Sequence, residues 1–559
     1  MNKKWRIKEY DAERTLQIKD KFKLPHLVAQ SLTEKNLTDE QINVFLSPTR
    51  KDFHDPFKLP DMEKAVERIL KAINLNEKIV IYGDYDADGI TSTTILKRYM
   101  RDRKVEVGTY IPNRLDEGYG LNEDAIKQIA KEGYTLIITV DCGITAENEV
   151  EIAKKFGVDV IITDHHEVPE KLPKAVAVID AKRKDNNYPF NQLAGCGVAF
   201  KLIQALSIKL NLKEEEWLKY IDIACIGTIS DIVPLIDENR VIAKLGLKLI
   251  QVTRNMGLKI LIESAGLKEI DSTAISFGIS PRVNACGRMG HQEDALNLFL
   301  TDDPIEARKL ASKIEGYNRE RQEIEKRIFN ECMEILSKEK DSPCIIIGKE
   351  NWHHGVIGIV SSKITDLTYK PSILVCFEGE EAKGSGRSIQ GFDLHNAVSK
   401  CKELLTAFGG HSMAIGLSLK TKDFEKFKKE MQKCANKENI DELKPELLID
   451  SVIDINDISI NNIDQLQLLE PFGESNSMPT IMYKNLKIDS IRSLSEGKHL
   501  KLVLIDGNTY IDAIGFNMGE LVDRYQIGDK VDVVGNIGVN RFRNTEKVQI
   551  TLSDMRISV

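Results

Sequence analysis

The sequence predicts an α/β protein of several domains: a doubly wound parallel sheet, a long connecting helix, a smaller α/β domain and a C-terminal β-barrel. Three observations lead to this fold class. Apolar β-like runs alternate with helical segments over residues 78–180, a charged, proline-free helical stretch covers 307–340, and short alternating strands fill the C-terminal part. At 559 residues, the chain is also too long for a single hydrophobic core.

The first domain is expected at 61–300, after a polar N-terminal lead-in at 1–60. Strands are predicted at 78–82, 105–112, 134–140, 158–163 and 175–180, with helices at 91–101, 122–133 and 148–157. Short apolar runs spaced by helices are typical of a parallel sheet with helices on both faces. Residues 195–300 have a helical pattern, and 301–340 form the connecting helix.

A second, smaller α/β domain is predicted at 341–440, where a strand, a loop, a helix and another strand follow one another. From 441 to 559 the pattern changes to about five short alternating strands. That number of strands in about one hundred residues is typical of a small closed barrel such as an OB-fold.

The composition narrows the class of protein. The net charge of −8 argues against a uniformly basic surface, but a carboxylate-rich metal site and basic grooves can coexist. The nine cysteines include no CxxC pair, which disfavours a zinc ribbon or a disulfide framework. The N-terminus lacks an apolar signal segment, and no run approaches the length of a membrane span. We therefore expect a cytoplasmic protein with reduced thiols and no membrane partner.

Three carboxylates, Asp84, Asp86 and Asp88, directly follow the first predicted strand. Gly89 would permit a tight turn, and Thr91 or Ser92 would cap the next helix. Carboxylates at this density repel one another unless cations neutralise them, and their oxygens suit Mg²⁺ or Mn²⁺. The alternatives are a solvated acidic turn or an EF-hand, although an EF-hand would need a later glutamate and a preceding helix.

Other candidate ligands also stand at the ends of predicted strands. Asp141 ends the third strand, and Asp164, His165 and His166 end the fourth. Ligands of open α/β sheets bind at the carboxyl ends of the strands, so these groups should converge with the first cluster. Together they predict a centre for two Mn²⁺ or Mg²⁺ ions, and Asp231 is a weaker candidate for the same centre.

Four segments in order resemble the motifs of the DHH phosphoesterase superfamily: GDYDADG at 83–89, VDCG at 140–143, TDHHE at 163–167 and SDIVPL at 230–235. Further segments resemble its single-strand-specific exonuclease family, namely SPRVNACGRMG at 280–290, WHHGVIGIVSSKI at 352–364, GSGRS at 384–388, GGH at 409–411 and EPFGESNSMP at 470–479. The resemblance covers nearly the whole chain.

The resemblance implies hydrolysis of single-stranded DNA from its 5′ end to 5′-mononucleotides, in DNA repair and recombination, by a two-metal in-line mechanism. It assigns the metal ligands as Asp86, Asp88, Asp141, His165 and Asp231, with Asp141 bridging. Related pyrophosphatases carry a histidine where this chain has Tyr82, and Asp84 or water would fill that gap. Neighbouring side chains on a strand face opposite ways, so His165 and His166 should differ in role. By analogy with the superfamily, His165 binds metal, His166 contacts the scissile phosphate and Asp164 orients a ring from behind.

DNA and 5′-phosphate contacts are expected from a larger set of residues. The set comprises Arg114, Arg282, Arg288, Ser385, Arg387, Gly409, Gly410 and His411, with Arg541, Phe542 and Arg543 in the last hairpin of the barrel. An aromatic residue between two arginines suits base stacking and phosphate contact, although an ordinary β-hairpin explains this hairpin equally well. His353 and His354 are expected to shape a helix start or contact DNA, because no acids are evident beside them.

The resemblance further implies single-stranded DNA as partner, cooperation with a helicase and a single-strand-binding protein, and a monomer. Two other functions remain open from the sequence. One is a phosphodiesterase of the same superfamily that acts on short oligonucleotides or cyclic dinucleotides, which the C-terminal barrel disfavours. The other is a non-catalytic DNA-binding scaffold, which would be expected to have lost metal ligands that this chain retains.

Overall fold

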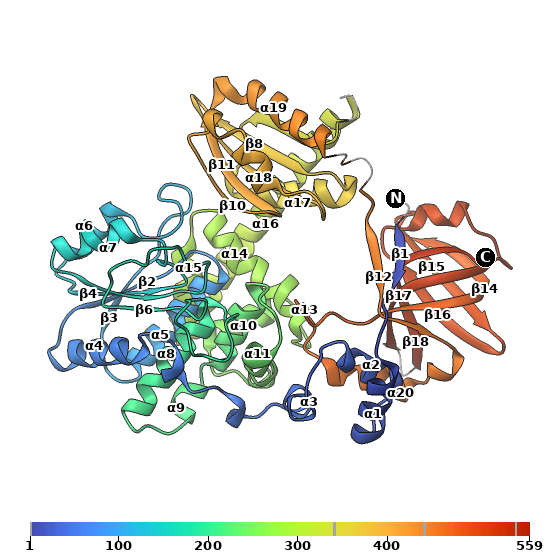
Figure 1. The fold of residues 1–559 in the computed structure, drawn as a ribbon, viewed down its shortest axis with the longest axis horizontal. Helices are drawn as coiled ribbons and strands as arrows, with labels where there is room; N and C mark the ends of the chain where they lie inside the picture. The colour runs from blue at the N-terminus through green and yellow to red at the C-terminus, as the bar shows by residue number, and fades with distance from the viewer. Residues whose placement is uncertain (1–2, 339–341, 439, 441–442, 543–544, 559) are drawn as a thin grey trace. The chain divides into compact units, whose positions relative to one another are not determined.

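The computed structural model describes residues 3–338, 342–438, 440, 443–542 and 545–558 (Figure 1). The chain divides into two compact units, which we describe separately. One comprises residues 54–233 and 245–444, and the other comprises 1–53, 234–244 and 445–559. In the described part of the chain, no helix is long and apolar enough to cross a membrane.

The larger unit contains the predicted parallel sheet. Its order is β3-β2-β4-β5-β6, with every neighbouring pair parallel. The strands are β2 (Ile79–Tyr82), β3 (Val107–Tyr110), β4 (Leu136–Val140), β5 (Asp159–Thr163) and β6 (Ala177–Ile179). All five lie inside the ranges predicted from the apolar runs, because strands covered on both faces are apolar throughout.

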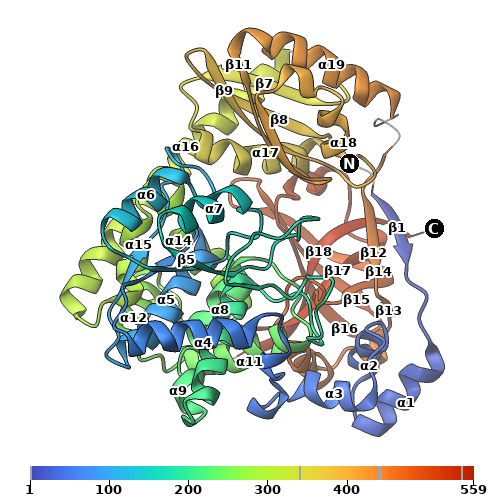
Figure 2. The same ribbon diagram turned by 60° about the vertical axis from the view of Figure 1, so that its left-hand side comes forward.

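Helices cover both faces of this sheet (Figure 2). On one face, α6 (Glu123–Lys131) and α7 (Glu147–Lys155) bury an apolar cluster with alternate strand residues such as Val80, Ile137 and Ile162. The other face contacts α4 (Met62–Asn74), α5 (Ala87–Arg101) and α8 (Gly195–Lys209). The sheet is therefore doubly wound, and its carboxyl edge is the natural place for a site.

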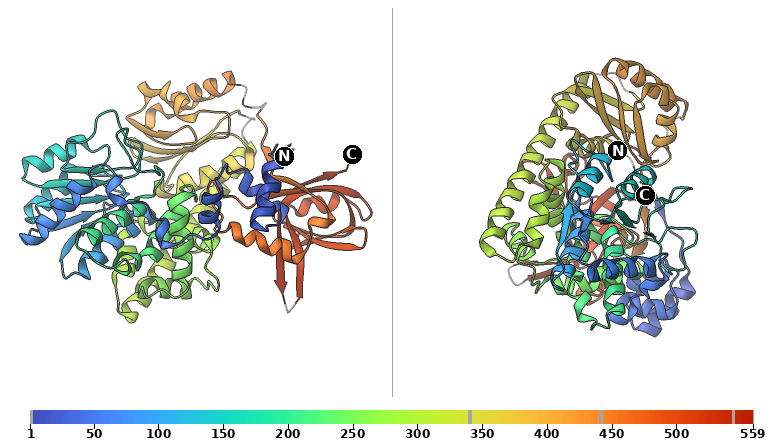
Figure 3. Two further views of the ribbon diagram at one scale, coloured as in Figure 1. Left: turned by 60° about the horizontal axis from the view of Figure 1, so that its bottom comes forward. Right: turned by 90° about the vertical axis from the view of Figure 1, so that its left-hand side faces the viewer.

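Helices continue the chain from α8 to the end of the predicted connector. They are α9 (Glu215–Leu218), α10 (Ile221–Ser230), α11 (Asp237–Ile250), α12 (Met256–Ser264), α13 (Ser272–Ala274), the π-helical η3 (Ile275–Ile279), α14 (Ser280–Arg288), α15 (Gln292–Leu300) and α16 (Pro304–Lys338). The connector α16 is one unbroken helix (Figure 3). It packs on α12, α14, α15 and α17, so it also contributes to the packing of this unit.

The second α/β region of this unit is a five-stranded mixed sheet of order β10-β11-β9-β8-β7. Its strands are β7 (Ile345–Glu350), β8 (Ser372–Glu378), β9 (Glu381–Arg387), β10 (Ala407–His411) and β11 (Ala414–Lys420). Its main helices are α17 (His354–Thr368), α18 (Leu394–Ser399) and α19 (Phe424–Lys437). The predicted strand–loop–helix–strand order at its start is confirmed.

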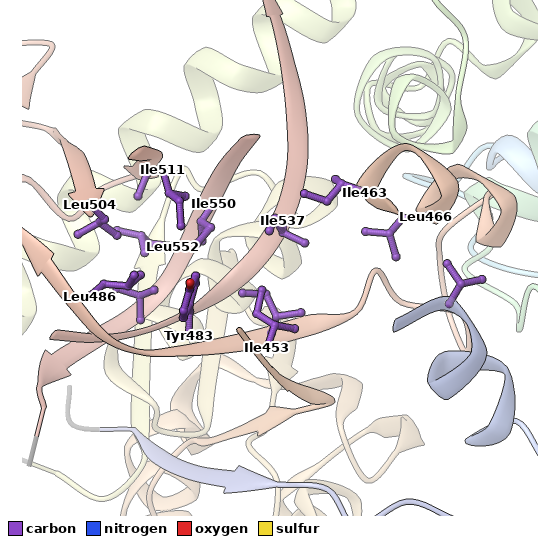
Figure 4. Close-up of a cluster of buried hydrophobic side chains, with 14 of the residues drawn as sticks. Ile453, Ile463, Leu466, Tyr483, Leu486, Leu504, Ile511, Ile537, Ile550 and Leu552 are labelled. Carbon is purple, nitrogen blue, oxygen red and sulfur yellow. The ribbon is translucent and has the colours of Figure 1, made fainter. Parts of the chain in front are cut away.

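The smaller unit contains the predicted barrel. Its strands are β13 (Ser451–Ile453), β14 (Thr480–Leu494), β15 (His499–Asp506), β16 (Thr509–Gly515), β17 (Lys530–Phe542) and β18 (Thr545–Ile557). The five strands from β14 to β18 close into a ring, because β14 pairs with both β15 and β17. Residues such as Tyr483, Leu504, Ile537 and Ile550 fill the interior (Figure 4).

The N-terminal lead-in belongs to the same unit as the barrel, which the sequence did not predict. Strand β1 (Lys4–Ile7) pairs in parallel with β12 (Glu446–Ile449). Helices α1 (Ala12–Phe22), α2 (His26–Thr33) and α3 (Asp39–Leu46) contribute Ile18, Val28 and other residues to the apolar core that the barrel strands line. The unit is thus built from segments more than 400 residues apart, as the 442-residue separation of Lys4 and Glu446 illustrates.

One buried arginine joins the three segments of this unit. Arg240, near the start of α11, is only 1% exposed and donates to the carbonyl oxygens of Phe45 (2.8 Å) and Glu470 (2.8 Å). Its guanidinium also lies 3.5 Å from the centre of the Phe45 ring. Burial lowers the pKa of Arg240 to about 9, so the carbonyl dipoles and the ring must offset the cost of burying the cation.

We expect Arg240→Ala to destabilise the smaller unit by about 3 kcal/mol, because it leaves buried carbonyl groups without donors. Thermal unfolding should show a lower midpoint, and hydrogen exchange should show earlier opening of α3 and of residues 465–471. Arg524→Ala, at a side chain that is 65% exposed, is the matched control. Equal effects of the two substitutions would contradict the proposed role of Arg240.

Candidate active site

The structure brings the predicted ligands together at the carboxyl edge of the parallel sheet. Among the described residues, three sets have ligand atoms within 4.8 Å of one another: Asp84, Asp86 and Asp141; Asp88, His165 and Asp231; and Asp141, His165 and His166. Residues from β2, β4 and β5 meet Asp231, which ends α10. Asp231, the weaker candidate from the sequence, therefore lies beside the strand-end ligands.

His165 lies at the centre of this cluster. Its Nε2 is 3.1 Å from Asp141 Oδ1, 3.6 Å from Asp231 Oδ2 and 3.8 Å from Asp88 Oδ2. The first two sets share no residue, but Asp141 and His165 link them through their short contact. Two neighbouring sets of three ligands are the arrangement that a pair of cations requires.

The loop after β2 differs from the prediction in one respect. Helix α5 begins at Ala87, and Asp86 caps it by accepting hydrogen bonds from the amides of Asp88 (2.9 Å) and Gly89 (3.1 Å). Asp88 and Gly89 are thus helical, and Thr91 and Ser92 are not the caps. A Cβ at Gly89 would lie 2.4 Å from the carbonyl oxygen of Asp84, so the glycine permits close packing of this loop rather than a tight turn.

Helix α8 fixes Asp88 and crowds Asp141. The amides of Gly195 (2.6 Å) and Cys196 (2.8 Å), at the N-terminus of α8, donate to the carboxylate of Asp88. A helix N-terminus favours negative charge, so it stabilises this carboxylate. Asp141 adopts the left-handed backbone conformation (φ 62°), and its Oδ1 is 2.5 Å from where a Cβ on Gly195 would lie. Only glycine fits at position 195.

Burial and mutual repulsion disfavour the charged form of several aspartates in the cluster. Burial raises the pKa of Asp84 and Asp141 well above the ordinary range, and neighbouring aspartates raise both further. Burial, with the charges of Asp88 and Asp86, raises the pKa of Asp231 to about 9. Asp84 Oδ1, Asp141 Oδ1 and His165 Nε2 are buried and have no hydrogen-bond partner among the described residues. Carboxylate oxygens with one imidazole fit Mn²⁺ or Mg²⁺, and a bound cation would keep these aspartates ionised.

The two adjacent histidines lie beyond the end of β5. The alternation of side chains between the two faces of a strand therefore does not apply to them. Their ring centres are 4.4 Å apart. The Nδ1 of His166 lies 2.7 Å from Asp164 Oδ1, and the other Asp164 oxygen accepts the amide of Ile144. Asp164 is thus placed to hold the ring of His166 from behind. The third set of ligand atoms includes His166, so this ring also lies within reach of a metal.

Tyr82 packs away from the cluster. Its hydroxyl donates to the carbonyl of Gly120 (3.0 Å), and its ring stacks on Tyr110 at 5.0 Å. Both residues belong to or pack against the apolar cluster under α6 and α7. Tyr82 therefore offers no ligand to the cluster. Asp84, whose buried Oδ1 has no hydrogen-bond partner among the described residues, stays the predicted replacement for the missing histidine.

Three of the predicted phosphate-binding arginines gather beside the acidic loop. The guanidinium carbon of Arg114 lies 5.1 Å from the ring centre of Tyr85, the residue that stands between Asp84 and Asp86 in the sequence. Burial, together with the charges of neighbouring arginines that include Arg114 and Arg387, lowers the pKa of Arg288 to about 10. Arg387 donates to Ser385 Oγ (3.2 Å), and its pKa is lowered by burial and by Arg114. Mutual repulsion among these guanidinium groups would be relieved by a bound anion.

Two other predicted arginines are paired with acidic side chains. Arg282 donates to Glu315 (2.7 Å) and to the carbonyl of Gly278 (2.7 Å), so its guanidinium is engaged within the protein. Arg541, in β17, pairs with Glu546 and Asp464. Phe542 ends β17, and Arg543 lies outside the described residues.

The remaining predicted residues lie in the second α/β region. Gly409, Gly410 and His411 form part of the edge strand β10. Lys182, and to a smaller extent His411, lowers the pKa of Glu167, which follows His166. His353 caps α17 by accepting the Gly355 amide, in agreement with a role at the helix start. His354 does have an acid beside it, because its Nδ1 is 2.8 Å from Glu378; the expectation of no neighbouring acid was wrong.

Comparisons with known proteins agree with this architecture. Residues 78–228 match the DHH family, N-terminal domain, residues 340–437 match the DHHA1 domain, and residues 449–554 match the RecJ OB domain. The single-stranded-DNA-specific exonuclease RecJ of Bacillus subtilis is 38% identical over 563 aligned residues, covering 99% of this chain and 71% of that protein. The chain belongs to the RecJ family. The superfamily and family predicted from the sequence are confirmed.

Solved structures of the RecJ family support the fold and the cofactor. RecJ from Thermus thermophilus in complex with Mn²⁺ superposes with a TM-score of 0.86 and 28% identity, covering 99% of this chain and 79% of that one. A Mg²⁺ complex of the same protein gives a TM-score of 0.79 and 26% identity, covering 99% and 78% of the two chains. The acid and histidine cluster of this RecJ family member fits either ion.

The structure adds residues that the sequence analysis missed. Asp180 follows β6, is fully buried, and has a pKa that burial raises to about 7. It ends a strand as Asp141 does, so the same rule could have identified it. The Tyr119 hydroxyl donates to the Asp141 carbonyl (3.2 Å) and lies 3.1 Å from His166 Nδ1. No spacing in the sequence indicates Tyr119, which reaches the site from a loop.

We expect Gly195→Ala to weaken Mn²⁺ binding by about 10- to 100-fold, because the new Cβ displaces Asp141. Isothermal titration of the metal-free protein with Mn²⁺ measures this change. Gly316→Ala is the matched control: Gly316 is also helical, and a Cβ there meets no atom within 4 Å. Unchanged Mn²⁺ affinity in Gly195→Ala would contradict the assigned position of Asp141.

Proposed function

We propose that this protein is a metal-dependent exonuclease that hydrolyses single-stranded DNA from the 5′ end to 5′-mononucleotides. The observation that carries the proposal is the pair of ligand sets linked by Asp141 and His165 at the edge of the sheet. The relatives that share its full architecture are named single-stranded-DNA-specific exonucleases. The C-terminal barrel favours a polymer over the short substrates of small phosphodiesterases.

Two bound cations would lower the pKa of a water molecule and stabilise the attacking and leaving oxygens. In the mechanism we propose, Asp86, Asp88, Asp141, His165 and Asp231 hold the ions, and Asp84 supplies a further oxygen. Asp164 holds the Nδ1 of His166, which leaves Nε2 to contact the scissile phosphate or protonate the leaving oxygen. No residue is required as a covalent nucleophile.

The arginine cluster gives this reaction its direction. Arg114, Arg288 and Arg387, with Ser385, would bind the terminal 5′-phosphate beside the loop that carries Asp84 and Asp86. A 5′-phosphate held at this point sets the next phosphodiester bond at the ions, so each cut releases one nucleotide. Gly409, Gly410 and His411, on the edge strand β10, remain candidates for strand contact.

We further propose cytoplasmic work in DNA repair and recombination, as a monomer, with a helicase and a single-strand-binding protein as partners. A helicase would supply the unpaired strand that the enzyme needs. The single-strand-binding protein would keep that strand unpaired, and the OB-type barrel would bind unpaired DNA by stacking and by electrostatics.

With Mn²⁺ and 5′-labelled DNA, we expect release of the labelled mononucleotide from single strands and none from blunt duplexes. Asp141→Ala should abolish release, because it removes the ligand that links the two sets, while single-strand binding in a filter or anisotropy assay stays intact. Asp124→Ala, at a fully exposed carboxylate, is the control. Retained cleavage in Asp141→Ala, or cleavage of dinucleotides alone, would contradict the proposed function.

Arg387→Ala should lower kcat/KM on 5′-phosphorylated strands by about 10- to 100-fold, the value of charge-assisted hydrogen bonds to a phosphate. On strands with a 5′-hydroxyl the loss should be much smaller, because no terminal phosphate is present. Arg308→Ala, on the exposed face of α16, controls for the loss of one positive charge. An equal loss of kcat/KM on both substrates would contradict the proposal that this pocket binds the 5′-phosphate.

A further inference from the structure

Two large apolar side chains are exposed near the candidate metal centre. Ile232 directly follows the predicted ligand Asp231 and is 70% exposed. Phe277, in the π-helical η3, is 79% exposed. A single exposed apolar side chain is common on a protein surface, so the case for a ligand contact depends on whether these two lie together beside the site.

The backbone of Ile232 is strained. Its φ is 58°, in the left-handed region, where a β-branched side chain carries a cost in backbone strain. Glycine would adopt this conformation without that cost. Since the side chain is largely exposed, its packing within the protein offsets little of the strain energy. The strain is explained if the isoleucine contacts something that the protein binds.

Phe277 lies at the same end of the site as Ile232. Ser280, three residues after Phe277, is hydrogen-bonded through its Oγ to the Oγ of Ser230, two residues before Ile232 (2.5 Å). Helix α10 also contacts η3. The π-helix is a rare conformation that recurs at functional sites, and here it carries an exposed aromatic ring.

Helix α14 relates this end of the site to the arginine cluster. It begins at Ser280 beside Ser230, and Asn284 in its middle accepts the amide of Ala87 at the metal-binding loop (2.8 Å). It ends at Arg288, which belongs to the arginine cluster. Phe277 and Ile232 are therefore at the opposite end of α14 from the proposed 5′-phosphate pocket.

We propose that Phe277 and Ile232 form an apolar platform for the nucleobases on the 3′ side of the scissile bond. This inference rests on the proposed function, since the arginine cluster sets where the 5′ end lies. An unpaired base presents a free π-face, and stacking on an aromatic ring tolerates any sequence. Bases inside a duplex are already paired and stacked, so the platform selects single strands at the cutting position.

The test is an abasic scan. Single-stranded 5′-phosphorylated oligonucleotides carry one abasic residue at the second, third or fourth position, and KM and kcat are measured with Mn²⁺. For the wild type, we expect KM to rise about 5- to 100-fold at one of these positions, with little change in kcat. Phe277→Ala should show the same rise on intact DNA and no additional rise at that position, because the stacking partner is already missing.

Phe156→Ala is the matched control, since Phe156 is 52% exposed and lies before β5, at the opposite edge of the sheet. Additive effects of Phe277→Ala and the abasic residue on KM would contradict the proposed platform. An abasic scan of the wild type in which KM is the same at every position would also contradict it. Wild-type protein that cleaves no single strand would instead refute the proposed function itself, and the platform with it.

Ile232→Gly provides a second variant that is expected to fold. Its melting temperature should be unchanged or higher, because the strain is removed, while KM for single-stranded DNA rises several-fold and kcat is retained. A structural role would produce the reverse, with lower stability. A fall in kcat without a change in KM would mean that Ile232 positions Asp231, and would remove it from the platform.

Discussion

The repulsion among carboxylates buried at one edge of the parallel sheet is the constraint on which the larger unit depends. Each surrounding element reduces it in a different way. The N-terminus of α8 donates two amides to Asp88, and Asp86 uses one oxygen to cap α5. His165 contacts three of the carboxylates. These neutral donors do not cancel the charge of the carboxylates, and bound cations would supply the remaining compensation.

Helix α14 connects the metal cluster with the arginine cluster that we propose binds the 5′ end of the strand. Through Ser280, Asn284 and Arg288 it contacts α10, the N-terminus of α5 and the N-terminus of α17. Over nine residues, an α-helix rises about 12 Å and is stiff. A stiff element that joins an anion pocket to a metal cluster keeps their separation constant, which is the physical requirement for releasing units of one size.

The sequence predicted the parts of the fold that depend on local pattern, and missed those that depend on distant contacts. Buried parallel strands are apolar throughout, so all five were placed, and strand ends then identified Asp141 and Asp164. The start of α5 was misplaced, because an aspartate that binds metal can also cap a helix, and the sequence does not rank the two roles. Glu378 beside His354 and the joining of 1–53 to the barrel involve separations that periodicity cannot detect.

The distribution of charge explains how a chain of net charge −8 can act on a polyanion. The excess of acid includes a cluster that cations would neutralise, while Arg114, Arg288 and Arg387 concentrate positive charge beside it. Phosphate contacts position a strand and carry no base specificity, and apolar stacking distinguishes paired from unpaired bases without reading their identity. A site that combines phosphate contacts and apolar stacking with a metal centre would select DNA by whether it is single-stranded and by the chemistry of its 5′ end. It would not select DNA by sequence. This is the selectivity that an enzyme needs to degrade any unpaired strand from its end.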